Sequence, residues 1–213
     1  MWIKKSIISI VFLSCFFSFR LLSFPLNIDN SSQLSTEKQY FYFFDRAEKS
    51  RKTGKYEDSI NLFEKSLILA RRIPDEKKEY ESLSRLGLLY WNKGRLVESS
   101  DFYKKALFLA TRLNLNEKQE EIEKTLKIYE FYKQGKKYRS SGNYKKSLKS
   151  FDRAIKLSRE IRSKEHELKC LRQLSITHFY SNELKKFQSL NKKSLEIARS
   201  LNHKEEEGKC LNN

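Results

Sequence analysis

The chain has 213 residues, a formal net charge of +17 at pH 7, and only 6 glycines and 2 prolines. This scarcity of Gly and Pro excludes folds that need many tight turns, such as β-sandwiches, barrels and Gly-rich nucleotide loops, and it favours long helices with short connections. One third of the residues are charged and 38% are hydrophobic, which suits a thin helical array better than a thick globular core.

The positive charge and the absence of catalytic motifs limit the possible functions. A charge of this size attracts nucleic acid, anionic lipid head groups or acidic protein surfaces, unless the lysines simply fill solvated helix faces. The three cysteines form neither a CxxC motif nor a His–Cys cluster, so we expect no metal and no cofactor. The sequence contains no GxSxG, HExxH or P-loop pattern, and we therefore expect no enzyme activity.

Residues 1–24 predict an export segment. The basic start MWIKK is followed by an apolar run at residues 6–19, an order typical of a secretory signal peptide. Alternatively, residues 6–24 remain as an N-terminal membrane anchor. The sequence Phe-Leu-Ser-Cys that ends at Cys15 resembles a degenerate bacterial lipobox, which would make Cys15 a lipidation site. We expect an exported protein of the periplasm or cell envelope, in which the polar residues 25–38 form a tether.

An internal repeat fills residues 39–213. Small residues recur at positions 70, 110, 158 and 198, and the turn residues Gly54, Gly94, Gly142 and Asn182 recur with the same spacings of 40, 48 and 40 residues. The extra residues of the longer interval fall within residues 114–126, where we expect them to lengthen the first helix of the third unit. The predicted helix pairs cover about residues 40–75, 80–115, 116–163 and 164–202, with a partial fifth unit at 203–213.

The residues within these units resemble the tetratricopeptide repeat, whose signature is W-x2-L-G-x2-Y followed by A-x3-F. The second unit carries Leu83-x2-Leu86-Gly87-x2-Tyr90 and then Ser99-x3-Tyr103. The third unit carries the corresponding residues Phe131, Gly135, Tyr138, Ser147 and Phe151. The fourth unit departs from the pattern, with Phe187 and Asn191 where a small and an aromatic residue are expected. The unit length is similar to a longer variant of about 40 residues. The resemblance implies an all-α, right-handed α-solenoid that binds other proteins.

In this family the first helix of each unit lines a concave groove, so the resemblance also implies a set of groove-facing side chains. These side chains are mostly aromatic or basic, a mixture that suits an acidic or aromatic-bearing segment of a partner protein. Alternatively, several of the aromatic side chains pack between neighbouring units. The predicted groove residues are Phe41, Phe44, Arg51, Lys52, Leu88, Trp91, Tyr129, Tyr132, Lys136, Arg139, Lys169, Arg172, Phe179 and Tyr180.

The last residues raise two further expectations. Cys170 and Cys210 occupy equivalent places in successive units, and adjacent helices lie too far apart for a disulfide, so we expect two small buried residues. The fifth unit stops after a short helix, which predicts a truncated solenoid or an end completed by a partner or by self-association. The main hypothesis is a protein-binding scaffold of a bacterial cell envelope. The alternative is a basic repeat protein that binds anionic lipid or, less consistently with export, nucleic acid.

Overall fold

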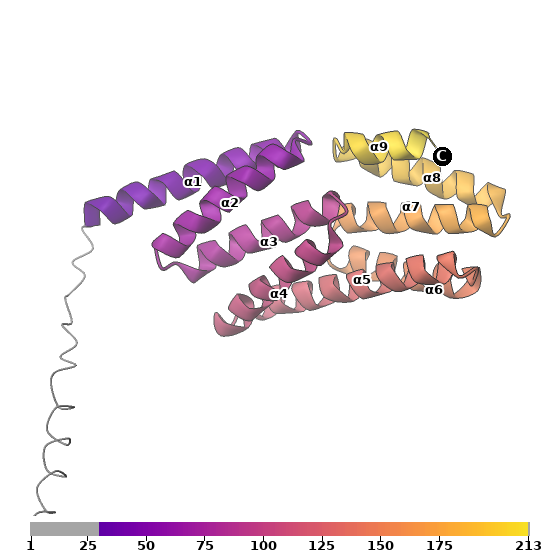
Figure 1. Cartoon of the computed structure of the whole chain (residues 1–213), viewed down its shortest axis with the longest axis horizontal. Coiled ribbons are helices and arrows are strands. Elements are labelled where there is room, and N and C mark those ends of the chain that lie inside the picture. The colour runs from indigo at the N-terminus through magenta and orange to yellow at the C-terminus, as the bar shows by residue number, and fades with distance from the viewer. Residues whose placement is uncertain (1–29, 213) are drawn as a thin grey trace, which may run out of the picture.

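The computed structural model describes residues 30–212, and these residues form α-helices and no strands (Figure 1). The expectations for residues 1–24, including lipidation of Cys15, lie outside the described residues. The helices are α1 (Asn30–Lys52), α2 (Tyr56–Arg72), α3 (Glu76–Asn92), α4 (Leu96–Arg112), α5 (Asn116–Ser140), α6 (Tyr144–Glu160), α7 (Lys164–Tyr180), α8 (Leu184–Ser200) and α9 (Lys204–Leu211).

Consecutive helices pack against each other as pairs, which confirms the predicted all-α solenoid. Units one to four are the pairs α1–α2, α3–α4, α5–α6 and α7–α8, and α9 packs on α8. Each unit also contacts the next one through its second helix. Because no pair can cover its own apolar face, this stacking produces one continuous core along the array.

The chain passes through a left-handed residue between the two helices of each unit. Gly54, Gly94, Gly142 and Asn182 have φ angles of 76°, 75°, 73° and 62°, as the repeat spacing predicts. At Gly94 the turn is closed by its own N–H, which donates to the Trp91 carbonyl at 2.8 Å. Such a turn ends one helix and starts the next within three residues, since glycine adopts positive φ without strain.

A serine of the second helix ties each of the first three pairs together. Ser59 Oγ donates to the Ala47 carbonyl at 2.8 Å, and Ser147 Oγ donates to the Gly135 carbonyl at 2.8 Å. Ser99 Oγ bonds to the Gly87 carbonyl in the same way. The small residue whose carbonyl accepts the bond lets the helices approach closely. The small residues of the repeat pattern therefore have a packing role.

Helix α5 is eight residues longer than most of the other helices, with 25 residues against 17, which confirms the predicted lengthening in the third unit. Eight helical residues add about 12 Å. The start of α5 packs on α4 and its second half on α6, so units three and four are displaced along α5 from units one and two (Figure 1).

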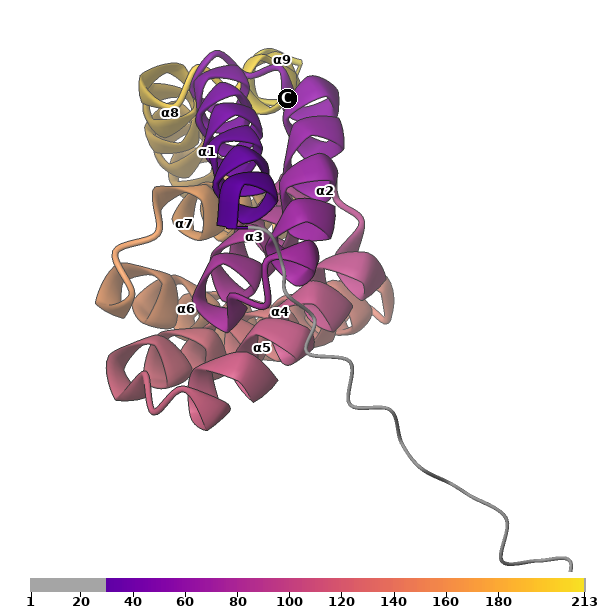
Figure 2. The ribbon, with the colours of Figure 1, turned by 90° about the vertical axis from the view of Figure 1, so that its left-hand side faces the viewer.

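The helices also follow a curved path that returns on itself. Figure 2 shows this path leading from α2 through α5 and back up to α8 and α9. Curvature and displacement together bring the first turns of α7 and α9 against the turns of units one and two.

The N-terminal helix starts earlier than expected. Helix α1 begins at Asn30, so the expectation of a tether at residues 25–38 is wrong from residue 30 onward. No Gly or Pro interrupts the sequence between residues 30 and 52. A helix that is held by packing from Tyr40 onward can therefore extend backward through polar residues. None of the helices within residues 30–212 combines the length and apolar character needed to cross a bilayer.

Candidate functional site

In units one and two, the face where we expected a groove is closed by a contact that we call the seam. In the seam, the turns of units one and two meet the first turns of α7 and α9. The Trp91 indole stacks on His166 with ring centres 4.8 Å apart, and its Nε1 donates to the Glu165 carbonyl at 3.4 Å. Lys169 Nζ donates to the carbonyls of Trp91 at 2.5 Å and Asn92 at 2.8 Å. The end of α3 is therefore fixed to the start of α7.

A second contact of the seam joins α9 to the turn of unit one. The Tyr56 ring lies 4.7 Å from the His203 ring. The Asn202 side-chain amide donates to the Lys52 carbonyl at 3.5 Å. A Cβ added to Gly54 would lie 2.6 Å from the Asn202 carbonyl oxygen, so glycine permits this close approach. The two ends of the described array are therefore in direct contact.

Buried charges hold α9 against α7. Glu206 is fully buried, and it pairs with Arg172 Nε at 2.6 Å and Lys209 Nζ at 3.0 Å. Its carboxylate also lies 3.9 Å from Lys169 Nζ. Burial lowers the pKa of Lys169 to about 8, although Glu206 opposes this shift. Burial would raise the pKa of Glu206, but the three cations outweigh burial and lower it. The lysine and the carboxylate are therefore both ionised at neutral pH.

The seam shows that part of the predicted groove is wrong. We expected an open groove along all four units, but six of its residues are buried or already paired within the molecule. The displacement along α5 moves the first turn of α7 against the end of α3, which covers most of them, and Arg172 pairs with Glu206 of α9. These residues are Arg51, Trp91, Tyr129, Tyr132, Lys169 and Arg172.

Three further predicted residues are partly buried. The rings of Phe44 and Phe63 meet edge to face at 5.1 Å, and Leu88 packs against the same core. Arg139 donates to the carbonyl of Gln173 at 3.1 Å and to its side-chain oxygen at 2.6 Å. Phe44 therefore packs inside unit one, against its second helix, and not between neighbouring units. Arg139 has a structural role in joining α5 to α7.

The remaining predicted residues have exposed side chains and lie in two separate places. Phe41 and Lys52 belong to α1, whereas Lys136, Phe179 and Tyr180 lie toward the ends of α5 and α7. Near Phe179 the rings of four residues form a continuous row. Tyr144 stacks on Tyr180 at 6.4 Å, Tyr180 meets Phe179 at 5.8 Å, and Phe179 meets Phe187 at 5.3 Å.

We call this surface the turn edge, because it lies where the turns of units three and four come together. It also includes exposed Leu184 and six lysines from the adjoining ends of α5, α6 and α8. The turns lie at the right-hand end of the molecule in Figure 1. The lysines of the turn edge are Lys136, Lys137, Lys145, Lys146, Lys185 and Lys186.

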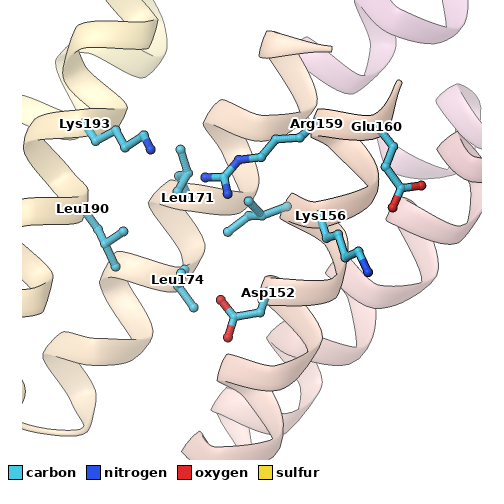
Figure 3. Close-up of a pocket in the computed structure, with 9 residues that line it drawn as sticks. Asp152, Lys156, Arg159, Glu160, Leu171, Leu174, Leu190 and Lys193 are labelled. Atoms are coloured by element: carbon cyan, nitrogen blue, oxygen red, sulfur yellow. The ribbon is translucent and has the colours of Figure 1, made fainter. Parts of the chain in front are cut away.

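Two hollows between second helices of neighbouring units were not predicted from the sequence. The larger, of about 680 Å³, lies between α6 and α8 over α7, and Leu171, Leu174 and Leu190 line it below charged side chains such as Lys193 (Figure 3). The smaller, of about 440 Å³, lies between α2 and α4, where Leu83 takes the place of Leu171. Their recurrence over the same helix of two units indicates hollows that the repeat packing itself produces.

The described residues contain no cluster suited to metal binding. No group of three or more His, Cys, Asp or Glu is placed to hold an ion within residues 30–212. Cys170 and Cys210 are buried as predicted, and both are free thiols. Burial raises the pKa of Cys210 to about 11. These cysteines pack as small apolar residues and are poor nucleophiles at neutral pH.

Stacked helix pairs, left-handed turn residues and serine–carbonyl ties define an α-solenoid built from repeats of one kind. Residues 80–110 and 131–161 match the family model described as tetratricopeptide repeat. The chain therefore contains repeats of the tetratricopeptide type, and repeats of this type imply a protein–protein interaction scaffold. No curated protein matches the chain.

Two solved structures resemble the chain in outline. BtubC (BKLC) from P. vanneervenii shares 12% identity, with 86% of this chain and 88% of that chain covered and a TM-score of 0.36. The MamA protein shares 16% identity, with 76% of this chain and 93% of that chain covered and a TM-score of 0.33. Neither TM-score reaches 0.5, and nothing about the function of this chain follows from them.

Proposed function

We propose that the protein is a non-catalytic scaffold of a bacterial cell envelope that binds a segment of a partner protein on the exposed part of its inner face. The observation that carries this proposal is the accessible set Lys136, Phe179 and Tyr180, the latter two with 52% and 57% of their surface exposed. Exposed aromatic side chains beside cations are enriched at protein interfaces. The excess of lysine favours an acidic partner segment.

The envelope location is supported by the sequence of residues 1–24, whose basic start and apolar run are typical of export. Such a segment would deliver the solenoid across a membrane or hold it at the membrane surface. Self-association through the short α9 also belongs to this proposal, since Leu211 at its end is 60% exposed.

Chemical cross-linking in intact cells, followed by capture of the full chain from envelope fractions, tests the proposal. We expect a specific partner protein that is lost with Ala106→Asp, which places a carboxylate in the fully buried centre of unit two and unfolds the array. Reversing Arg139 and Arg172 is unsuitable as a control, because both hold the fold together. Recovery of no protein, or equal recovery with the unfolded variant, would contradict the proposal.

A second candidate function is binding to anionic lipid head groups, and the outward face of α1 favours it. Lys38, Tyr42, Arg46 and Lys49 are exposed along this face, and Phe41 lies beside them. Aromatic rings and cations are the side chains that membrane interfaces attract. Co-sedimentation with phosphatidylglycerol vesicles that disappears with Arg46→Glu plus Lys49→Glu would support this function. Equal sedimentation of that variant would reject it.

A further inference from the structure

The turn edge of units three and four has an equivalent surface in units one and two. Only the surface in units one and two is covered by another part of the chain. By the repeat spacing, Arg51 and Trp91 occupy the positions of Arg139 and Phe179. In units one and two these residues lie in the seam, where another part of the chain packs on them. In units three and four, Arg139 is bonded to Gln173 of α7, whereas Phe179 and its neighbours remain exposed. The molecule therefore contains one occupied and one unoccupied copy of the same surface.

The segments that occupy the first copy are both starts of helices with acidic first turns, although α9 contacts the turn of unit one through Asn202 and His203 just before that turn. Helix α7 begins with Glu165 and Glu167 in its first turn, and α9 begins with three consecutive glutamates at residues 205–207. Arg51 pairs with Glu165 at 3.3 Å, and Trp91 donates to the Glu165 carbonyl. A cation and a ring of the turn surface thus hold the acidic start of a helix.

The unoccupied copy, which is the turn edge and is called the free copy below, is more apolar than the copy in the seam. The reason is that unit four breaks the repeat pattern. Phe187 stands where the other units have the serine that bonds to a carbonyl of the first helix. Instead, Phe187 packs against Phe179 at 5.3 Å, and Ser175 Oγ donates to the Phe187 carbonyl at 3.3 Å. The replacement of serine by Phe187 adds a further aromatic ring to the row of rings at the turn edge. Its accessible rings provide anchors for an apolar side chain.

The charge of the free copy is strongly positive. Its six lysines lie near a single acidic residue of the same turns, Glu183. That carboxylate is already engaged, since it pairs with Lys186 and lies 3.3 Å from His178 Nδ1. An acidic ligand would therefore meet unneutralised lysines beside exposed rings.

We propose that the turn edge binds the acidic first turn of a helix from a partner protein, in the way that the seam binds the start of α7. This inference rests on the proposed scaffold function and names the surface and the partner chemistry. A second copy of the chain is a poorer occupant, because its α7 and α9 starts are held in its own seam. The occupant is therefore a different protein with Asp or Glu in the first turn of an amphipathic helix.

Site-specific photo-cross-linking of the full chain in the cells that make it tests this inference. A photoreactive amino acid replaces Tyr180 in one variant and Phe108, which is 64% exposed on the outer face of α4, in a control. We expect a cross-link at position 180 and none at position 108. Mass spectrometry of the cross-linked peptide should identify an acidic helix start of another protein.

Charge reversal provides the matched comparison. Lys145→Glu with Lys185→Glu should lower the cross-link yield at position 180 by about ten-fold or more, whereas Lys104→Glu with Lys192→Glu reverses two exposed lysines elsewhere and should leave it unchanged. A neutral or basic peptide, a second copy of the chain, or an unchanged yield with the first pair would overturn the inference. Capture of a partner only at position 108 would overturn it while preserving the scaffold function. Capture at neither position would contradict both.

Discussion

Gly135 of α5 lies directly against the ring of Phe151 of α6, so that a Cβ added to Gly135 would come within 2.6 Å of Phe151 Cζ. Phe151 is fully buried and cannot move aside freely. We predict that Gly135→Ala lowers the free energy of unfolding by about 1–3 kcal/mol in urea titrations, because the clash outweighs the better helix propensity of alanine. Gly208→Ala is the control, since no atom lies within 4 Å of its added Cβ. Equal effects of the two substitutions would refute this account of the repeat glycine.

Arg162 between units three and four has a φ angle of 54°, which costs free energy for a residue with a side chain. The equivalent residues between other units are Asn114 and Asn202, with φ angles of 53° and 52°. We predict that Arg162→Gly raises the free energy of unfolding by about 1 kcal/mol. Lys149→Gly, at an exposed helical position in α6, should lower it by about the same amount. Destabilisation by the first substitution, measured by urea unfolding, would show that the arginine side chain compensates for the strain.

Glu206 and Glu205 are neighbours on α9 that differ in burial. Glu206 is fully buried between Arg172, Lys169 and Lys209, whereas Glu205 is exposed and pairs with Lys209 at 2.6 Å. Removing the buried carboxylate leaves buried cations without a partner, so Glu206→Ala should cost about 3–5 kcal/mol. Glu205→Ala should cost less than about 1 kcal/mol. Urea unfolding with hydrogen exchange of α9 distinguishes the two, and similar costs would mean that the buried carboxylate does not hold α9 against α7.

Two histidines of the seam predict how stability depends on pH. Burial lowers the pKa of His166 to about 3 and that of His203 to about 4. Their ordinary value is 6.5, so the unfolded chain binds more protons than the folded chain between these limits. The stability that the neutral rings contribute is therefore complete above pH 6.5 and is lost as the pH falls through that window. The expected slope is about 1.4 kcal/mol per pH unit for each histidine.

The measurement is urea unfolding at several pH values between 7.5 and 5. The pKa of Glu206 is lowered from 4.5 by its cationic partners, against the effect of burial. Protonation of Glu206 therefore begins to reduce the free energy of unfolding only below this pH range. We expect a lower midpoint at pH 5 in the native sequence. His166→Gln should reduce the slope by about half, because one of the two proton-binding rings is gone. A flat profile in the native sequence would show that the rings are accessible to solvent.

The fold was predictable because its signals are local. Gly54, Gly94 and Gly142 mark turns through their backbone conformation, and the small residues beside Tyr103 and Phe151 mark close helix contacts. Each of these properties depends only on neighbours within one unit, so regular spacing reveals it. The lengthening of α5 was also visible, since eight residues without Gly or Pro continue a helix.

The seam was not predictable because it depends on contacts between distant units. Trp91 and Lys169 were assigned to an open groove from their positions within their own units, yet Lys169 Nζ bonds to the Trp91 carbonyl across 78 residues. Only the offset along α5 and the curvature of the whole array bring them together. The first turn of α7 reads as an ordinary acidic helix start in the sequence, with nothing to show that it packs against another unit.

The length of α5 has a consequence for how this molecule could change over time. This one helix sets the offset between units one and two and units three and four. Adding or removing residues before Lys124, which pairs with Glu160 of α6, would change that offset and leave the internal contacts of every helix pair intact. A single insertion would therefore separate Trp91 from His166 and expose to solvent the rings that the seam now buries.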